Sequence, residues 1–153
     1  MFPFLQRRAR SFFSQEDNER LQEAIRSAEK RTSGEIRVYV ENRCRYMEAT
    51  HRAEELFTQL AMQKTDQRNG VLIYLAIKDR QLAVWGDQGI HEKVGSSYWE
   101  ERVAAMLRSF DKEDFATGLT NCITAIGEAL SHHFPYDRST DRNELSDEIV
   151  FGR

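Results

Sequence analysis

Two apolar segments joined by a short polar turn constrain the fold of this chain more than any other feature. The segments cover residues 70–77 and 81–86, with Lys78-Asp79-Arg80 between them. Short apolar runs bounded by turn residues are typical of buried strands, and a short connection makes the pair antiparallel. The second run ends in Gly86-Asp87-Gln88-Gly89, which places one carboxylate between two glycines. A lone carboxylate there adds little to packing, so this loop is the first candidate functional site.

Helical and strand patterns alternate along the rest of the chain. Capping residues and apolar stripes predict helices that begin at about residues 15, 47, 97 and 115 and end at about 31, 64, 110 and 134. A further strand is expected over residues 35–40. The predicted order is α-β-α-β-β-α-α followed by a polar tail. Apolar strands between amphipathic helices favour an α/β fold, a three-layer α/β/α sandwich with a central mixed sheet of about four strands.

The length of 153 residues fits one domain that can bury a substantial core. We expect an N-terminal tail over residues 1–13, the domain over 14–135 and an acidic tail over 136–153. Two alternatives are open for the acidic tail. Either it stays solvated, or the apolar side chains of Leu145, Ile149 and Phe151 dock it onto the domain.

Composition excludes several classes of function. The formal net charge of −3 gives no general case for binding nucleic acid. No apolar run approaches the roughly 20 residues of a membrane span, and no secretory signal pattern is present. Cys44 and Cys122 lack metal-binding or redox spacing. We therefore expect a cytoplasmic protein with reduced thiols. The phenylalanines and arginines of residues 1–10 leave open contact with a membrane surface or with a membrane-associated partner.

Strand connections predict which polar residues meet in space. The strands over 35–40 and 70–76 are joined through a helix, so they should run parallel. The third strand forms a hairpin with the second and therefore runs antiparallel to both. Its end must then lie beside the starts of the other two. This topology places Asp87 on the same rim as Glu35 and the turn over residues 66–69.

The residues of this rim offer only oxygen ligands. Carboxylate and amide oxygens suit a hard cation such as Ca²⁺ or Mg²⁺. The predicted metal ligands are therefore Asp87, Glu35, Asp66 and Asn69. The competing interpretation is structural, with Asp87 capping the turn and Glu35 pairing with a surface arginine.

The acidic tail holds a second group of oxygen ligands. Counted from Asp137, oxygen-bearing side chains fall at positions 1, 3, 5, 7 and 12, as in an EF-hand loop. Arg142 stands at position 6, where that loop requires glycine. Two interpretations are open: a solvated tail, or a docked tail whose Glu144 and Asp147 complete or create a metal site.

Four segments, in this order, resemble the TPM domain family: residues 32–38, 69–76, 86–90 and 114–119. The chain resembles a stand-alone bacterial member. The resemblance implies an α/β/α sandwich and divalent-metal binding at the strand-end loops, and family names mention phosphatase activity. More usual membrane-bound members carry a Gly-x-Gly-Leu-Glu-like sequence where this chain has residues 86–91, and this departure strengthens the expectation that Asp87 is the ligand particular to this variant.

Two functions follow as hypotheses. The first is a Ca²⁺- or Mg²⁺-binding domain that acts as a metal-modulated interaction module for an unidentified protein partner. The alternative is a weak metal-dependent phosphatase acting on phosphomonoesters. Known phosphate-binding loops and nucleophile motifs are absent from the sequence, so enzyme activity is undecided at this level.

Overall fold

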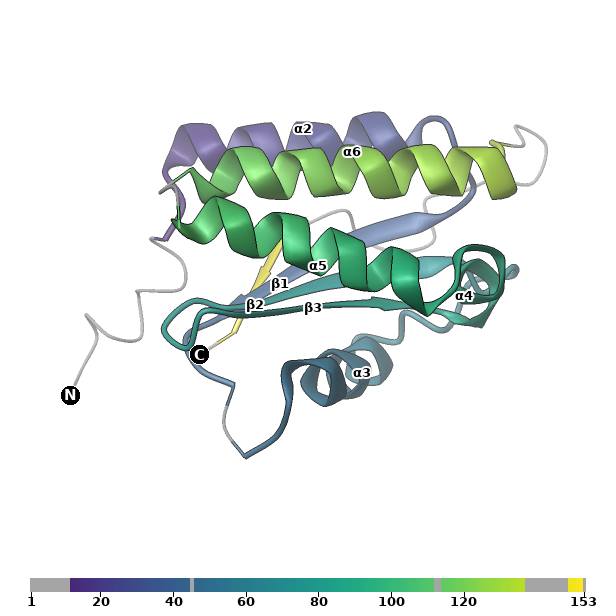
Figure 1. Ribbon diagram of the computed structural model, residues 1–153. Coiled ribbons are helices and arrows are strands. Elements are labelled where there is room, and N and C mark those ends of the chain that lie inside the picture. The colour runs from purple at the N-terminus through teal and green to yellow at the C-terminus, as the bar shows by residue number, and fades with distance from the viewer. Residues whose placement is uncertain (1–11, 45, 112–113, 137–148, 153) are drawn as a thin grey trace.

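The computed structural model describes residues 12–44, 46–111, 114–136 and 149–152. Figure 1 shows the arrangement of the helices and strands. In chain order they are α2 (Gln15–Glu29), β1 (Glu35–Glu41), α3 (Ala49–Gln59), β2 (Gly70–Ala76), β3 (Gln81–Gly86), α4 (Gln88–Val94), α5 (Ser96–Asp111), α6 (Phe115–His133) and β4 (Ile149–Phe151).

The four strands form one mixed sheet in the order β3-β2-β1-β4. β1 and β2 are parallel and pair from Glu35↔Gly70 to Glu41↔Ala76. β3 runs antiparallel to β2, with Val71 opposite Gly86. β4 is parallel to β1, with Ile149 opposite Val38. The predicted directions of the first three strands are confirmed, and β3 forms one edge of the sheet.

Helices cover both faces of the sheet. α2 and α6 lie side by side over one face, α5 packs against α6 and β3 on the same side, and α3 covers the opposite face (Figure 1). Two clusters of buried apolar side chains fill the spaces between these layers. The predicted three-layer α/β/α sandwich is therefore confirmed. No helix within the described segments is long and apolar enough to cross a membrane.

The first helix begins where its capping sequence predicts. The Asp17 backbone N–H donates to the Ser14 hydroxyl oxygen at 3.0 Å, which satisfies one of the unpaired donors of the first turn. Phe13 is buried before the cap and stacks on Phe115 with ring centroids 6.2 Å apart. The apolar stripe of α2 then packs on α6.

Other boundaries differ from the sequence prediction. α3 ends at Gln59 rather than near residue 64, because Ala61 adopts a left-handed backbone with φ of 57°. α5 begins at Ser96, one residue before the predicted start, and Asp114 makes no side-chain capping hydrogen bond to α6. Sequence patterns also missed α4, whose seven residues are too few to show a helical period.

One buried polar network joins α3 to the sheet. The Arg52 guanidinium reaches the Glu41 carboxylate with Nε–Oε2 at 2.8 Å and Nη2–Oε1 at 3.0 Å. The Tyr74 hydroxyl donates to the same carboxylate. Glu41 thus has partners on both sides, which offsets the cost of burying its charge. Cys44 and Cys122 are free and buried.

Candidate functional site at one end of the sheet

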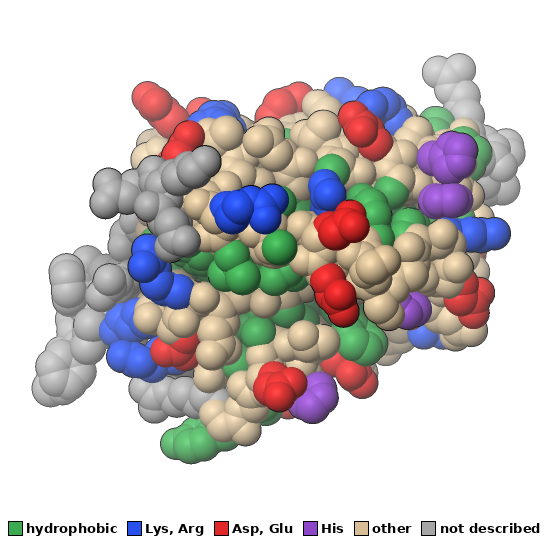
Figure 2. Space-filling view, in the orientation of Figure 1, with side chains coloured by type: hydrophobic (Ala, Val, Ile, Leu, Met, Phe, Trp, Pro, Cys, Tyr) green, Lys and Arg blue, Asp and Glu red, His purple; other side chains and the backbone are tan. Residues whose placement is uncertain are grey.

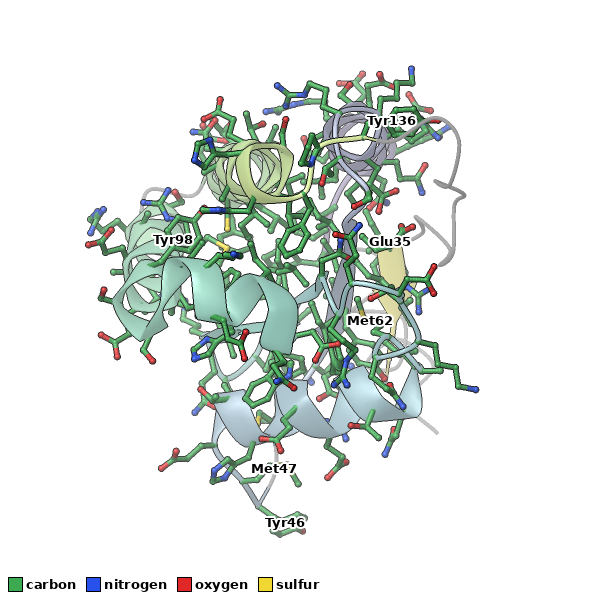
Figure 3. All side chains as sticks on the ribbon, turned by 90° about the vertical axis from the view of Figure 1, so that its right-hand side faces the viewer. Glu35, Tyr46, Met47, Met62, Tyr98 and Tyr136 are labelled. Atoms are coloured by element: carbon green, nitrogen blue, oxygen red, sulfur yellow. The ribbon has the colours of Figure 1, made fainter. Side chains whose placement is uncertain are left out.

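Glu35, Asn69 and Asp87 come from three separate segments and lie at the same end of the sheet. The Asp87 backbone N–H donates to the Gly70 carbonyl at 2.9 Å, and the Glu35 N–H donates to the Asn69 carbonyl at 3.4 Å. Figure 3 looks onto this end of the sheet, with Glu35 labelled. The prediction that the strand connections bring these residues to one rim is correct.

Asp87 is buried, with 5% of its surface exposed, and holds two structural contacts. Its carboxylate caps α4 by accepting a hydrogen bond from the Gln88 N–H at 2.8 Å. The Arg68 guanidinium donates two hydrogen bonds to the same carboxylate, with Nε–Oδ2 at 2.6 Å and Nη2–Oδ1 at 2.9 Å. Hydrogen bonding to Asp87, and then its charge, raise the pKa of Arg68. The capping role foreseen as the alternative for Asp87 is therefore present.

The loop before β2 is held by side-chain hydrogen bonds. The Asn69 N–H donates to the Thr65 hydroxyl at 3.2 Å. The Ser33 hydroxyl oxygen accepts from Gln67 Nε2 at 3.0 Å and from Asn69 Nδ2 at 3.1 Å. These contacts tie the loop to the residues just before β1.

The amide oxygen of Asn69 is the unusual atom of this site. Asn69 is 1% exposed, and its Oδ1 has no hydrogen-bond partner within the described segments. Leaving a buried acceptor unpaired costs about 1–3 kcal/mol. A bound cation or water molecule would satisfy this oxygen, which makes it the strongest pointer to a ligand at this end of the sheet.

The glycines on either side of Asp87 permit close packing. The Gly89 N–H donates to the Arg68 carbonyl at 2.8 Å, and a Cβ at Gly89 would lie 2.1 Å from the Gln67 carbonyl oxygen. A Cβ at Gly86 would lie 2.3 Å from the Trp99 ring. Both positions therefore exclude larger residues for steric reasons. The Gly-Asp-x-Gly sequence joins the loop before β2 to α4 and α5.

The other predicted ligands are Asp66 and Glu35, which the structure describes, and Glu144 and Asp147, which lie outside the described residues. Asp66 is exposed in the loop before β2, and Glu35 is buried at the start of β1. Within the described ranges, no group of three or more His, Cys, Asp or Glu side chains is arranged to hold a metal ion. An ion here would therefore depend on amide and carbonyl oxygens, or on ligands from outside those ranges.

Sequence reasoning missed Arg68 and the partner of His91. Arg68 lies in the turn that the strand connections bring next to Asp87. Its positive charge could therefore have indicated an ion pair with Asp87 from the sequence alone. His91 Nδ1 accepts a hydrogen bond from Trp99 Nε1 at 3.0 Å. Nothing local in the sequence marks this second pair, because it depends on how α4 and α5 pack against each other after the chain turns at Gly95.

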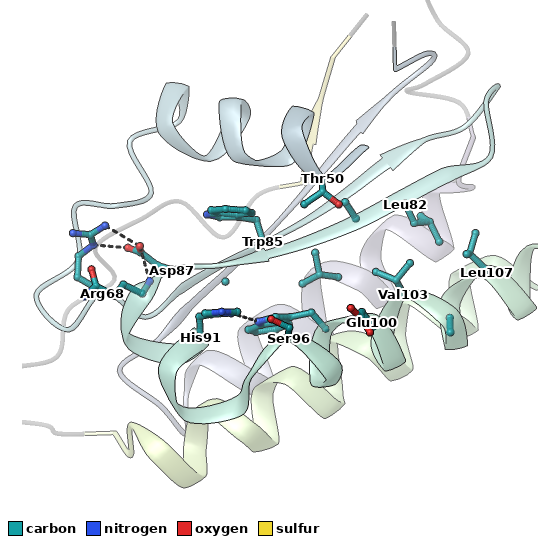
Figure 4. A pocket seen from close by; sticks show the side chains of 16 residues that line it. Thr50, Arg68, Leu82, Trp85, Asp87, His91, Ser96, Glu100, Val103 and Leu107 are labelled. Carbon is teal, nitrogen blue, oxygen red and sulfur yellow. Dashed lines mark hydrogen bonds and ion pairs between the residues drawn. The ribbon is translucent and has the colours of Figure 1, made fainter. Parts of the chain in front are cut away.

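A groove extends from Asp87 and Arg68 along the free edge of β3. Its volume is about 820 Å³, and it runs between α5 and α3. Figure 4 shows Asp87, Arg68 and His91 at one end and Leu82 and Leu107 toward the other. The candidate cation site and the groove therefore share Asp87.

A four-stranded mixed sheet, covered by helices on both faces and bearing polar loops at one end, defines a small α/β/α sandwich protein. A family model for the TPM domain matches residues 7–129, and the chain belongs to this family. No curated protein matches the chain.

Solved structures support this assignment. The NMR structure of BA42 protein from the psychrophilic bacterium Bizionia argentinensis has 37% sequence identity and a TM-score of 0.84, and the match covers 93% of this chain and 97% of that chain. The N-terminal domain of cg2496 protein from Corynebacterium glutamicum has 16% identity and a TM-score of 0.57, covering 77% and 74%. The N-terminal domain of a P. gingivalis protein has 15% identity and a TM-score of 0.63, covering 83% and 84%. The last two show similarity of fold alone.

Proposed function

We propose that this TPM domain binds Ca²⁺ or Mg²⁺ at the end of the sheet and acts as a metal-modulated interaction module. The observation that supports it most directly is the buried Oδ1 of Asn69, which has no hydrogen-bond partner among the described residues. The proposed ligand side chains offer carboxylate and amide oxygens, which favour a hard cation.

Asp87 and Asn69 are the proposed central ligands. Both are buried at the same end of the sheet, and together they offer a carboxylate and an amide oxygen. Asp66, Glu35, Glu144 and Asp147 remain candidates for the further positions. Neighbouring backbone carbonyls would supply other ligands, as they commonly do for Ca²⁺.

Arg68 gives the proposal a physical means of modulation. Its guanidinium neutralises Asp87 in the structure, so a cation that takes Asp87 as a ligand must displace it. The Arg68 side chain is 48% exposed, so its guanidinium can move into solvent when a cation displaces it. Exchange of Arg68 for a cation would alter the loop before β2, where the groove begins. A ligand that favours one arrangement of a loop shifts its population.

Calorimetric titration tests the cation site. Chelator-stripped full-length chain is titrated with Ca²⁺ and Mg²⁺ as wild type, Asp87→Asn and Arg68→Gln. We expect Asp87→Asn to weaken binding at least about tenfold through loss of a charged ligand, while Asn preserves the helix cap. Arg68→Gln should strengthen binding because it removes the competing charge.

Asp79→Asn is the matched control, since Asp79 is paired with Arg43 in the turn at the opposite end of β3. It should bind cations as wild type does. Absence of saturable binding, or equal affinity of wild type and Asp87→Asn, would show that Asp87 is only a structural cap.

The alternative of a weak phosphatase is tested with the same proteins. A phosphomonoesterase that uses the proposed cation should hydrolyse 4-nitrophenyl phosphate only with metal present and lose this activity in Asp87→Asn. Hydrolysis that disappears on repurification, or that survives the substitution, would count against it.

A further inference from the structure

The groove along β3 has a strand edge as its floor. β3 is the outermost strand of the sheet beside β2. The Asp87 N–H bonds to Gly70, and antiparallel pairing alternates, so residues 81, 83 and 85 direct their backbone groups to β2. The N–H and C=O groups of Leu82, Val84 and Gly86 then face the groove. They make no hydrogen bond with any residue that the structure describes.

The walls of the groove are mainly apolar and come from both helical layers. Val103 and Leu107 of α5 line one wall, and Trp85 points to the other side of the strand, toward Thr50 of α3 (Figure 4). Leu107 is 40% exposed, although it is a large apolar side chain. Figure 2 shows hydrophobic side chains along the hollow between these helices, with acidic side chains at its borders.

We propose that this groove binds an extended peptide segment of a partner protein, which adds to β3 as a fifth strand. An apolar small molecule would cover the walls but leave the backbone donors and acceptors of β3 unpaired, at a cost in free energy. A strand pairs with them and places alternate side chains against the two walls. The six residues of β3 set the length of the bound segment at about five or six residues.

The charged side chains that line the groove determine which peptides it favours. Arg68 and Asp87 neutralise each other at one end of the groove. Glu100 lines the groove, is exposed and has no ion pair or hydrogen bond with a described residue. The remaining charge is therefore negative, and the favoured segment carries a lysine or arginine beside its apolar residues. The inference deepens the proposed role as an interaction module, but it requires no cation.

NMR titration of the full-length chain tests the inference. The probe is acetyl-Lys-Val-Thr-Val-Thr-Val-amide, with one version carrying glutamate in place of lysine and one N-methylated at alternate residues. The lysine peptide should bind saturably and shift the amide signals of Leu82, Val84 and Gly86. The N-methylated peptide should bind at least about tenfold more weakly, because it cannot donate the strand hydrogen bonds.

Glu100→Lys and Glu101→Lys form a matched pair of variants. Both positions are exposed on α5, but only Glu100 lines the groove. Glu100→Lys should weaken binding of the lysine peptide about threefold to fivefold and strengthen binding of the glutamate peptide, as expected for an exposed charge pair. Glu101→Lys should match wild type.

Three outcomes would overturn the inference: no saturable binding, equal binding of the N-methylated peptide, or equal effects of the two variants. Light scattering gives a fourth. If the chain forms a dimer, and if the substitution Ala104→Arg in the groove dissociates that dimer, the strand edge binds a second copy of the chain instead of a partner peptide. The peptide titrations are run in chelator and repeated in Ca²⁺, which separates the peptide proposal from the cation proposal. Peptide binding in chelator would support a peptide site in the groove even if Asp87 binds no metal.

Discussion

Tyr74 illustrates how burial changes the chemistry of a single residue. Its ring is fully buried in β2, and its hydroxyl donates to the Glu41 carboxylate. Burial first, and then the hydrogen bond and charge of Glu41, raise the pKa of Tyr74 above its ordinary value. The folded protein therefore keeps this phenol neutral at pH values where the unfolded chain would ionise it.

Stability should fall as the pH rises above about 10, the ordinary pKa of tyrosine. Below that pH both states hold the Tyr74 proton. Above it the unfolded state loses the proton first, so unfolding is favoured by up to about 1.4 kcal/mol per pH unit. Tyr74→Phe should reduce this slope, measured by urea unfolding between pH 9 and 11.

Tyr46→Phe is the control, because Tyr46 is 98% exposed. It should leave the slope of wild type unchanged. Equal slopes for Tyr74→Phe and wild type would show that ionisation of Tyr74 does not contribute to alkaline unfolding.

At the scale of elements, helix ends determine where the chain can turn. Ser14 supplies a side-chain acceptor at the start of α2, whereas Asp114, which precedes α6, makes no side-chain capping hydrogen bond. At the end of β3, Asp87 begins α4 directly after the strand. The same residue therefore ends a strand, starts a helix and binds Arg68, which fixes the geometry of the candidate site.

Ser14→Ala should lower the free energy of unfolding by about 1 kcal/mol, because the Asp17 N–H loses its acceptor. For a chain of this length the melting temperature should fall by roughly 2–4 °C. Ser27→Ala is the control on the same helix, since Ser27 is exposed and, among the described residues, its hydroxyl hydrogen-bonds to the exposed Glu23 rather than to a backbone group. Thermal unfolding followed by circular dichroism compares them. Equal losses in the two variants would contradict a capping role.

At the scale of the whole molecule, a segment from the end of the chain extends the sheet. β4 pairs with β1 across more than one hundred residues of sequence. Ile149 is buried in the larger core cluster, while Val150 is only partly buried. The Gly152 N–H also donates to the Val40 carbonyl at 2.6 Å.

Ile149→Ala should destabilise the protein by about 2 kcal/mol, since it removes a buried side chain and leaves a cavity. Val150→Ala, on the alternate side of the same strand, should cost less than about 1 kcal/mol. Urea unfolding measures both. A smaller loss for Ile149→Ala than for Val150→Ala would mean that β4 contributes little core packing.

The sequence by itself determined the elements that local physics controls. The apolar runs of β2 and β3, the capping sequence at Ser14 and the stripes of the long helices are all readable within a few residues. The shared rim of Glu35, Asn69 and Asp87 was also predictable, because strand direction follows from the type of connection.

Only the tertiary structure decided the contacts between distant segments. Examples are the Arg68–Asp87 pair, the groove on β3 and the buried oxygen of Asn69, which no described residue pairs. All three depend on how loops and helices approach one another, and no local sequence period records this. α4 is one example, being too short for a pattern, and the early end of α3 at Gln59 is another, since it depends on a single left-handed residue. The fold was therefore accessible from periodicity and topology, whereas the site depends on atomic contacts between residues that are not neighbours in sequence.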